Sequence, residues 1–497
     1  MNEKELLEII ERAARERWGK LDLSGRGIEI LTGNIGILRD LEELGLNDNK
    51  LEYLPPEIGN LKKLQKLFMR SNKLRSVPSE ILELKELRFL SLESNDLVDI
   101  PSDIFKLHSL RLLHLHNNVI TSVPAGIGEL DNLYSLLLRN NHLKALPSEI
   151  GLLKNLVKLI IRNNDLDSLP PEIGDLLRIK VLDVCYNKLS VIPKEIGKLQ
   201  ELQILDLHCN QITDIPTEIM FLKKMEMINV GFNRVKGLPP EIGHVENLME
   251  LRAARNEIEY LPIEMKMLKK LRMLDISNNR ISNLPDGICE LVNLEEVIVK
   301  GNKLTSIPYD IGRLSKLKKL SLGGNKLKSL PGGLGKLKNL EILLVASNEL
   351  ETLPPEIGNI KRLERFWVNR NHLTSLPPEL AHLDNLREFD AGENPIKSPP
   401  VEVVQQGTRA ILEYLRAGPR RREWLSKLLV VGEGGVGKTS LLRALRGEEF
   451  IEGLETTHGI GLGKIQLAHP SEEEVMMQLN TWDFGGQQIY HATHQFF

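Results

Sequence analysis

A 23-residue unit recurs along most of the chain without insertion or deletion. Its clearest copy is Leu41–Lys63, LEELGLNDNKLEYLPPEIGNLKK. A fixed period of this length predicts a solenoid of stacked, nearly identical coils. The ninth place of each copy is an asparagine, in strict register at Asn49, Asn72, Asn95, Asn118, Asn141, Asn164, Asn187, Asn210, Asn233, Asn256, Asn279, Asn302, Asn325, Asn348, Asn371 and Asn394.

The residues of one unit indicate how a coil folds. Leu44 and Leu46 alternate as on a short strand, and neighbouring coils would align such strands in a parallel sheet. The proline of LPPEIG favours a short helical return, and the asparagine can hydrogen-bond backbone groups of adjoining coils. The pattern L-x-x-L-x-L-x-x-N-x-L-x-x-L-P resembles the leucine-rich repeat. Four more apolar residues would line the interior that stacking buries: Leu51, Leu54, Ile58 and Leu61.

Segments of a different character flank the repeats, which occupy residues 21–400. In residues 1–20, apolar residues have helical spacing, and Asn2 with Glu5 has the pattern of a capping box. We expect this helix to cap the first coil; a partner-binding or membrane-surface helix is the alternative. Residues 401–415, VEVVQQGTRAILEYL, are typical of one amphipathic helix covering the last coil. The following residues up to 424 include Arg420–Arg422, which we interpret as a solvated linker rather than a nuclear signal.

The third, fifth and seventh places of each repeat would face outward on the concave side of the sheet. Apolar patches with a polar rim are typical of protein recognition, so we predict that a protein partner binds there. Scattered apolar residues on a solvated face are the alternative. Seven residues form the predicted apolar band: Phe89, Leu112, Leu137, Ile160, Val181, Ile204 and Met227.

Composition narrows the class of protein. The net charge is −3, which gives no reason to expect nucleic-acid binding. No stretch approaches the roughly 20 apolar residues of a transmembrane helix. Three cysteines occur and no hydrophobic leader follows Met1, so we expect a cytoplasmic protein with reduced thiols.

A metal centre within the repeats has little support. Cys185, His208 and Cys209 fall on successive strand ends, with His116 three coils away. A tetrahedral centre needs four converging ligands, and these residues lack ordinary zinc spacing. We interpret them as incidental residues.

The composition changes at Trp424. Leu428–Val431 is a continuous apolar strand, which runs into GEGGVGKT and then a helical segment, residues 440–446. This satisfies G-x-x-x-x-G-K-[ST] between a strand and a helix. Lys438 would reach the β and γ phosphates, and the Thr439 hydroxyl would bind Mg²⁺. The predicted phosphate-binding residues are Gly432, Glu433, Gly434, Gly435, Val436, Gly437, Lys438, Thr439 and Ser440.

Two later segments extend this nucleotide site. Thr457, in TTHGI, would bind Mg²⁺ and sense the γ phosphate, and Asp483 would hold Mg²⁺ through water. The Gly486 amide would meet the γ phosphate, and Gln487 would orient the attacking water. Lys438 and Gln487 are therefore the candidate catalytic residues. Each residue taken singly can instead be an ordinary loop or turn former, but their order and spacing favour a nucleotide site.

Taken together, the repeats, EVVQQGTRAILEYLR, KLLVVGEGGVGKTSLL, TTHGI and WDFGGQQIYHATHQFF resemble the Roco family. The resemblance implies an α/β fold class: a leucine-rich-repeat solenoid followed by a Ras-like P-loop GTPase domain called Roc, here residues 425–497. It also implies GTP or GDP as ligand, Mg²⁺ as cofactor, and a switch that couples nucleotide state to signalling. A dimerising COR domain usually follows Roc in this family, and sometimes a protein kinase domain.

The sequence ends at Phe497, before an [NT]-K-x-D guanine-reading motif. Guanine specificity therefore comes from the resemblance alone. We interpret the chain as truncated within Roc, and we expect GTP hydrolysis and dimerisation to need the downstream part. Two other interpretations stay open: a non-catalytic repeat scaffold whose Roc segment binds no nucleotide, and a fragment of a larger Roco protein kinase.

Overall fold

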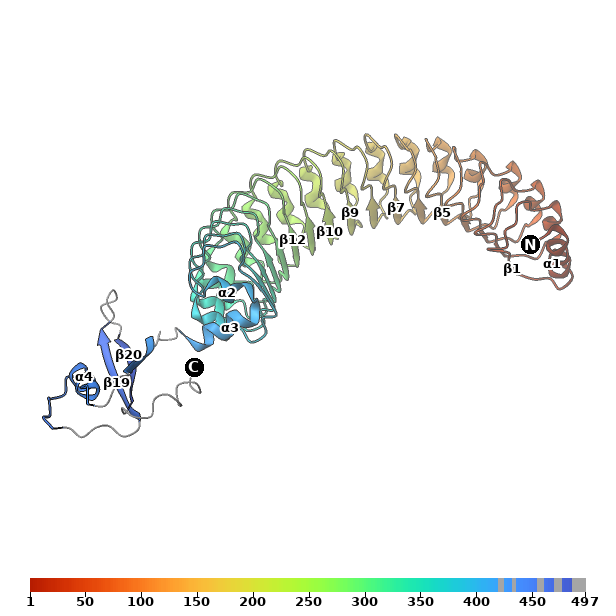
Figure 1. Ribbon diagram of the computed structural model, residues 1–497. Coiled ribbons are helices and arrows are strands. Elements are labelled where there is room, and N and C mark those ends of the chain that lie inside the picture. Colours follow the sequence, from red (N-terminus) through yellow and green to blue (C-terminus); the bar gives the residue numbers. More distant parts are fainter. Residues whose placement is uncertain (419–423, 431–434, 454–459, 469–475, 485–497) are drawn as a thin grey trace. The chain divides into compact units, whose positions relative to one another are not determined.

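The computed structural model describes residues 1–418, 424–430, 435–453, 460–468 and 476–484. They divide into two units, Met1–Arg416 and Ala417–Phe497, which are described separately. The first unit is a curved solenoid with one coil per sequence repeat (Figure 1). The predicted solenoid of stacked coils is therefore confirmed.

Short parallel strands line the inner face of the solenoid. Within residues 1–418 they form one 17-stranded sheet. Neighbouring strands pair 23 residues apart, so that Leu44 lies opposite Leu67. The middle residue of every strand is buried, and the residues on either side of it face the inner surface. The strands are β1 Lys20–Asp22, β2 Glu43–Gly45, β3 Lys66–Phe68, β4 Phe89–Ser91, β5 Leu112–His114, β6 Ser135–Leu137, β7 Lys158–Ile160, β8 Val181–Asp183, β9 Ile204–Asp206, β10 Met227–Asn229, β11 Glu250–Arg252, β12 Met273–Asp275, β13 Glu296–Ile298, β14 Lys319–Ser321, β15 Ile342–Leu344, β16 Arg365–Trp367 and β17 Glu388–Asp390.

Each coil returns through a five-residue 3₁₀ helix, as the LPPEIG segment predicts. From η2 onward a proline directly precedes the helix, and its ring fixes φ near −68°, as at Pro170. The helices are η1 Gly33–Ile37, η2 Pro56–Asn60, η3 Ser79–Glu83, η4 Ser102–Lys106, η5 Ala125–Glu129, η6 Ser148–Leu152, η7 Pro171–Asp175, η8 Lys194–Lys198, η9 Thr217–Phe221, η10 Pro240–His244, η11 Ile263–Met267, η12 Asp286–Glu290, η13 Tyr309–Arg313, η14 Gly332–Lys336, η15 Pro355–Asn359 and η16 Pro378–His382.

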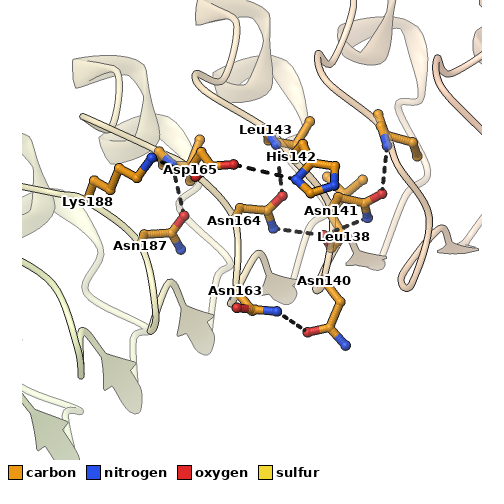
Figure 2. Close-up of polar contacts among 12 residues, drawn as sticks. Leu138, Asn140, Asn141, His142, Leu143, Asn163, Asn164, Asp165, Asn187 and Lys188 are labelled. Atoms are coloured by element: carbon orange, nitrogen blue, oxygen red, sulfur yellow. Dashed lines mark hydrogen bonds and ion pairs between the residues drawn. The ribbon is translucent and has the colours of Figure 1, made fainter.

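The repeated asparagine joins consecutive coils. Asn164 Oδ1 accepts a hydrogen bond from the Leu143 amide at 3.0 Å. Its Nδ2 donates to the carbonyls of Leu138 at 3.0 Å and Ile161 at 2.9 Å. Figure 2 shows this residue between the equivalent Asn141 and Asn187. Because these backbone groups are shielded from water, they need such partners. The predicted role of the asparagine is confirmed.

Helices close both ends of the solenoid. The N-terminal helix α1, Glu3–Arg15, has the expected capping box between Asn2 and Glu5, and it buries Leu6, Ile10 and Ala13. At the other end, the prediction of one continuous helix is wrong. The segment forms α2, Val401–Gln405, and α3, Thr408–Ala417, because Gly407 adopts a left-handed φ of 88° between them. Thr408 Oγ1 then accepts a hydrogen bond from the Phe389 amide of β17 at 2.9 Å.

The described residues of the second unit form a small mixed sheet and one helix. Its described elements are β18 Trp424–Val430, α4 Lys438–Leu445, β19 Ile460–Ala468 and β20 Met476–Phe484. The strand order is β18–β20–β19, with β18 parallel and β19 antiparallel to β20. The strand expected at Leu428–Val431 begins earlier, at Trp424, and Val431 lies outside the described residues. Leu442 of α4 and Ile465 of β19 are buried.

Candidate functional site

The nucleotide motif lies between β18 and α4. Gly435 and Gly437 have φ values of 80° and 84°, a left-handed conformation that glycine adopts without strain. Gly437 directly precedes α4, and its carbonyl accepts a hydrogen bond from the Leu441 amide at 2.9 Å. Lys438 and Thr439 therefore occupy the first turn of the helix, the end at which the helix dipole favours an anion. Gly432, Glu433 and Gly434 lie outside the described residues.

The second part of the site is a contact between α4 and the end of β20. Thr439 Oγ1 donates a hydrogen bond to Asp483 Oδ2 at 2.5 Å. β20 brings Asp483 opposite Val430, the last residue of β18, and so beside the start of the loop. The Asp483 side chain is nearly inaccessible, since the residue is 5% exposed. The structure thus unites two predicted site residues that are 44 positions apart.

The second carboxylate oxygen of Asp483 indicates the kind of ligand that this contact could bind. Within the described part of the chain, Oδ1 is buried and has no hydrogen-bond partner. Burial of a charged oxygen without a partner is costly unless a cation or donor compensates it. Mg²⁺ takes oxygen ligands and retains several waters. The Thr439 hydroxyl and the Asp483 carboxylate therefore fit the Mg²⁺ that the motif implies.

A further contact, which the motifs do not reveal, positions α4 on the sheet. Arg446 Nη2, just after α4, donates a hydrogen bond to Thr481 Oγ1 at 2.8 Å. Thr481 is buried and lies two residues before Asp483, on the same face of β20. A Cβ atom at Gly463 of β19 would collide with the Arg446 guanidinium. Glycine within a strand often marks such a close approach, and this was the one available signal in the sequence.

The structure describes only some of the remaining residues that were predicted to bind the nucleotide. Val436 is exposed before α4, whereas Ser440 is half-buried in its first turn. Thr457, Gly486 and Gln487 lie outside the described residues. Their assignment to the switch segments and to catalysis stays a prediction.

The predicted apolar band lies on strands β4 to β10 and is staggered rather than continuous. Phe89 pairs with Leu112 in the row of first strand residues. The apolar residues then shift to the last strand position, where Leu137 lies opposite Ile160. They return to the first row with three residues on adjacent strands: Val181, Ile204 and Met227. All seven residues are half-buried, and Ser135 and Lys158 interrupt the first row.

The cysteine region contains a different grouping from the one considered above. Ligand atoms of Asp183, Cys185 and Asp206 lie within 4.8 Å of one another, and the described residues show no such group that includes His208 or Cys209. Burial, and then the Asp183 carboxylate, raise the pKa of the Cys185 thiol. A protonated thiol is a poor metal ligand. We assign no metal centre here.

Comparisons with known proteins agree with both units. The family model described as "Ras of Complex, Roc, domain of DAPkinase" matches residues 427–497. Leucine-rich-repeat models match residues 39–97, 86–143, 170–260, 270–291 and 292–350. The solved structure of a leucine-rich-repeat protein from Leptospira interrogans is similar, with 37% identity, a TM-score of 0.69, and coverage of 80% of this chain and 96% of that chain. The plant peptide hormone receptor RGFR1, solved with RGF2, has 35% identity and a TM-score of 0.68 over 76% of this chain and 63% of its own.

Curated relatives match shorter stretches. The probable serine/threonine-protein kinase roco11 of Dictyostelium discoideum is 36% identical over 114 residues, which are 20% of this chain and 7% of that protein. The Ras-related protein Rab-32 of Mus musculus is 38% identical over 86 residues, 17% of this chain and 35% of that protein. The chain thus spans under a tenth of the kinase and about a third of the Rab protein.

The fold and these matches define a leucine-rich-repeat protein with a Ras-like P-loop domain at its C-terminal end. The chain carries leucine-rich repeats followed by a Roc domain, and over about a fifth of its length it is similar to the Roco kinases roco11 and pats1. Among the described residues, no helix is both long enough and apolar enough to cross a membrane.

Proposed function

We propose that the protein is a cytoplasmic, guanine-nucleotide-binding switch whose leucine-rich repeats bind protein partners. The buried contact between Thr439 and Asp483 carries the nucleotide part of this proposal. P-loop proteins use a loop Ser or Thr together with a strand-end Asp to hold Mg²⁺. Both residue types occur here in those places, and the second oxygen of Asp483 has no hydrogen-bond partner among the described residues.

The chain's own residues would share the work as follows. The glycine loop and the first turn of α4 bind the phosphates through backbone amides, and Lys438 neutralises the β and γ phosphates. Thr439, Thr457 and Asp483 hold Mg²⁺, which neutralises charge on the β and γ phosphates when bound. Gly486 contacts the γ phosphate, and Gln487 orients water for hydrolysis. Loss of the γ phosphate would release the segments that contain Thr457 and Gly486. This release is the conformational switch.

Replacing Lys438 with alanine should weaken GTP binding about 10- to 100-fold. The lost hydrogen bond to a charged phosphate is worth about 1.5–3 kcal/mol. Titration of a fluorescent GTP analogue in excess Mg²⁺ measures the effect. Lys464→Ala is the matched control, because Lys464 is exposed on β19 of the same unit. Equal affinity of both variants would refute the phosphate loop, and a preference for ATP would refute the guanine assignment.

The partner-binding part rests on the apolar band. Solved plant receptors of similar architecture, RGFR1 and HAESA, are complexes with RGF2 and with an IDA peptide hormone, respectively. Ile160 and Ile204 are half-buried on the inner face and remain accessible to a partner. A partner that covers them removes apolar surface from water, which stabilises the complex.

Introducing Ile160→Asp together with Ile204→Asp should abolish capture of cytosolic protein partners, because a complex would then bury two charges. Quantitative affinity capture followed by mass spectrometry measures the loss. Leu152→Asp with Leu177→Asp is the control, since these leucines are 53% and 57% exposed and lie outside the inner-face strands. Unchanged capture by the isoleucine variant would exclude the band. Intact capture in the wild type without any nucleotide affinity would favour the non-catalytic scaffold.

A further inference from the structure

A hollow of about 570 Å³ lies where strands β3 to β8 begin. It is lined by Phe89 and Leu112, the first two residues of the apolar band. It is also lined by residues just before the strands, among them Arg88, Arg111 and Tyr134. The hollow is therefore continuous with the proposed partner surface and opens at its edge.

The charge of this hollow is of one sign. Lys66, Arg88, Arg111 and Arg178 line it, and none of its eleven lining residues, all described, carries a carboxyl group. Lys66 is paired with Glu43 outside the lining at 3.2 Å, and Arg178 donates to the Asn155 amide oxygen at 2.8 Å. The exposed guanidinium groups of Arg88 and Arg111 form no ion pair with any described residue.

Equivalent positions in later coils are arranged differently. Arg88 and Arg111 occupy the second place of consecutive repeats, on adjacent coils. In two later coils the cation at this place faces a carboxylate of the preceding coil, whereas Lys180 and Arg272 follow Val157 and Met249. Lys318 pairs with Glu295 at 2.7 Å, and Arg387 pairs with Glu364 at 3.8 Å. At the hollow, by contrast, an arginine follows an arginine, and two like charges repel each other.

Building on the proposed partner-binding function, we propose that this hollow binds an acidic peptide segment of the protein partner. Carboxylates of the segment pair with Arg88 and Arg111, whose planar guanidinium groups suit bidentate contacts. An adjacent apolar side chain of the segment packs on Phe89 and Leu112. The charge pattern thus orients the partner, because only one end of the apolar band carries these unneutralised arginines.

Selection from a phage-displayed library of random peptides on the 497-residue protein tests this proposal. We expect the selected peptides to be enriched in Asp and Glu next to apolar residues. A synthetic selected peptide should lose at least about tenfold in affinity for Arg88→Glu with Arg111→Glu, because its carboxylates then meet like charges. The control variant, Lys318→Glu with Arg387→Glu, changes the net charge equally at the same place in other coils and should bind the peptide like the wild type.

A charge swap guards against a variant that simply misfolds. A peptide with lysine in place of its acidic residues should bind the protein variant Arg88→Glu with Arg111→Glu more tightly than it binds the wild-type protein. Selected peptides without an acidic excess, or equal affinity of both variants for the acidic peptide, would overturn the proposal. So would tighter arginine-dependent binding of single-stranded oligothymidine than of the peptide. If acidic peptides fail while the Ile160 and Ile204 variant still loses partner capture, the proposed function stands and only this inference falls.

Discussion

Replacing Asn164 with alanine should lower the free energy of unfolding of the solenoid by about 3–5 kcal/mol. The change removes the acceptor of the Leu143 amide and the donor to the carbonyls of Leu138 and Ile161. Only the Leu143 amide is then left without a partner, which costs about 1–3 kcal/mol. The two carbonyls keep hydrogen bonds from Asn141 and Asn187 and lose one bond each, worth about 0.5–1.5 kcal/mol per bond. Because each coil contacts only its neighbours, the loss of stability should be largest in the coils next to Asn164.

Urea denaturation followed by circular dichroism measures the loss, and hydrogen exchange at the Leu143 amide locates it. Asn283→Ala is the matched control. Asn283 is exposed, and its one side-chain bond, to Ser282 Oγ, is 3.3 Å long. Its replacement should change stability by less than about 0.5 kcal/mol. Similar losses of unfolding free energy in both variants would contradict the structural role of the repeated asparagines.

Changing Asp483 to asparagine should remove most of the Mg²⁺ dependence of GTP binding. Asparagine retains an oxygen that accepts the Thr439 hydroxyl hydrogen bond, but it lacks the negative charge that attracts Mg²⁺. We expect the ratio of GTP affinities with Mg²⁺ and with EDTA to fall from about 100-fold to below about threefold, a difference of about 2 kcal/mol.

Titrations of a fluorescent GTP analogue in Mg²⁺ and in EDTA give this ratio for each variant. Glu452→Gln provides the control, because it removes one negative charge from an exposed residue of the same unit. Its ratio should equal that of the wild type. An unchanged ratio of the two affinities in Asp483→Asn would show that Asp483 does not contribute to the Mg²⁺ site.

The solenoid was predictable because its sequence signal is periodic. Each coil repeats the same buried leucines and the same asparagine, so local pattern and tertiary packing agree. Two features were not predictable by this means. Gly407 divides the C-terminal helical segment, which a helical apolar pattern does not disclose. The staggered layout of the predicted apolar band also follows only from the sheet, on which the third and fifth places of a repeat form separate rows.

The proposed nucleotide site was predictable as far as its motifs reach. A phosphate loop is contiguous in the sequence, and the motif logic also pairs Thr439 with Asp483. The contact between Arg446 and Thr481 joins a helix end to a strand 35 residues away without a recognised spacing. Only Gly463, which leaves room for the guanidinium, hinted at it.

The three-residue strands have a consequence for how such a protein changes over time. In each strand one side chain is enclosed by neighbouring coils, while the two beside it face the inner surface. Substitutions at the outer two can therefore alter what is recognised without disturbing how the coils pack. Phe89 beside Leu112, and Lys319 beside Glu296, are two outcomes at one such variable place on an unchanged framework. New binding preferences can thus arise through single replacements, coil by coil.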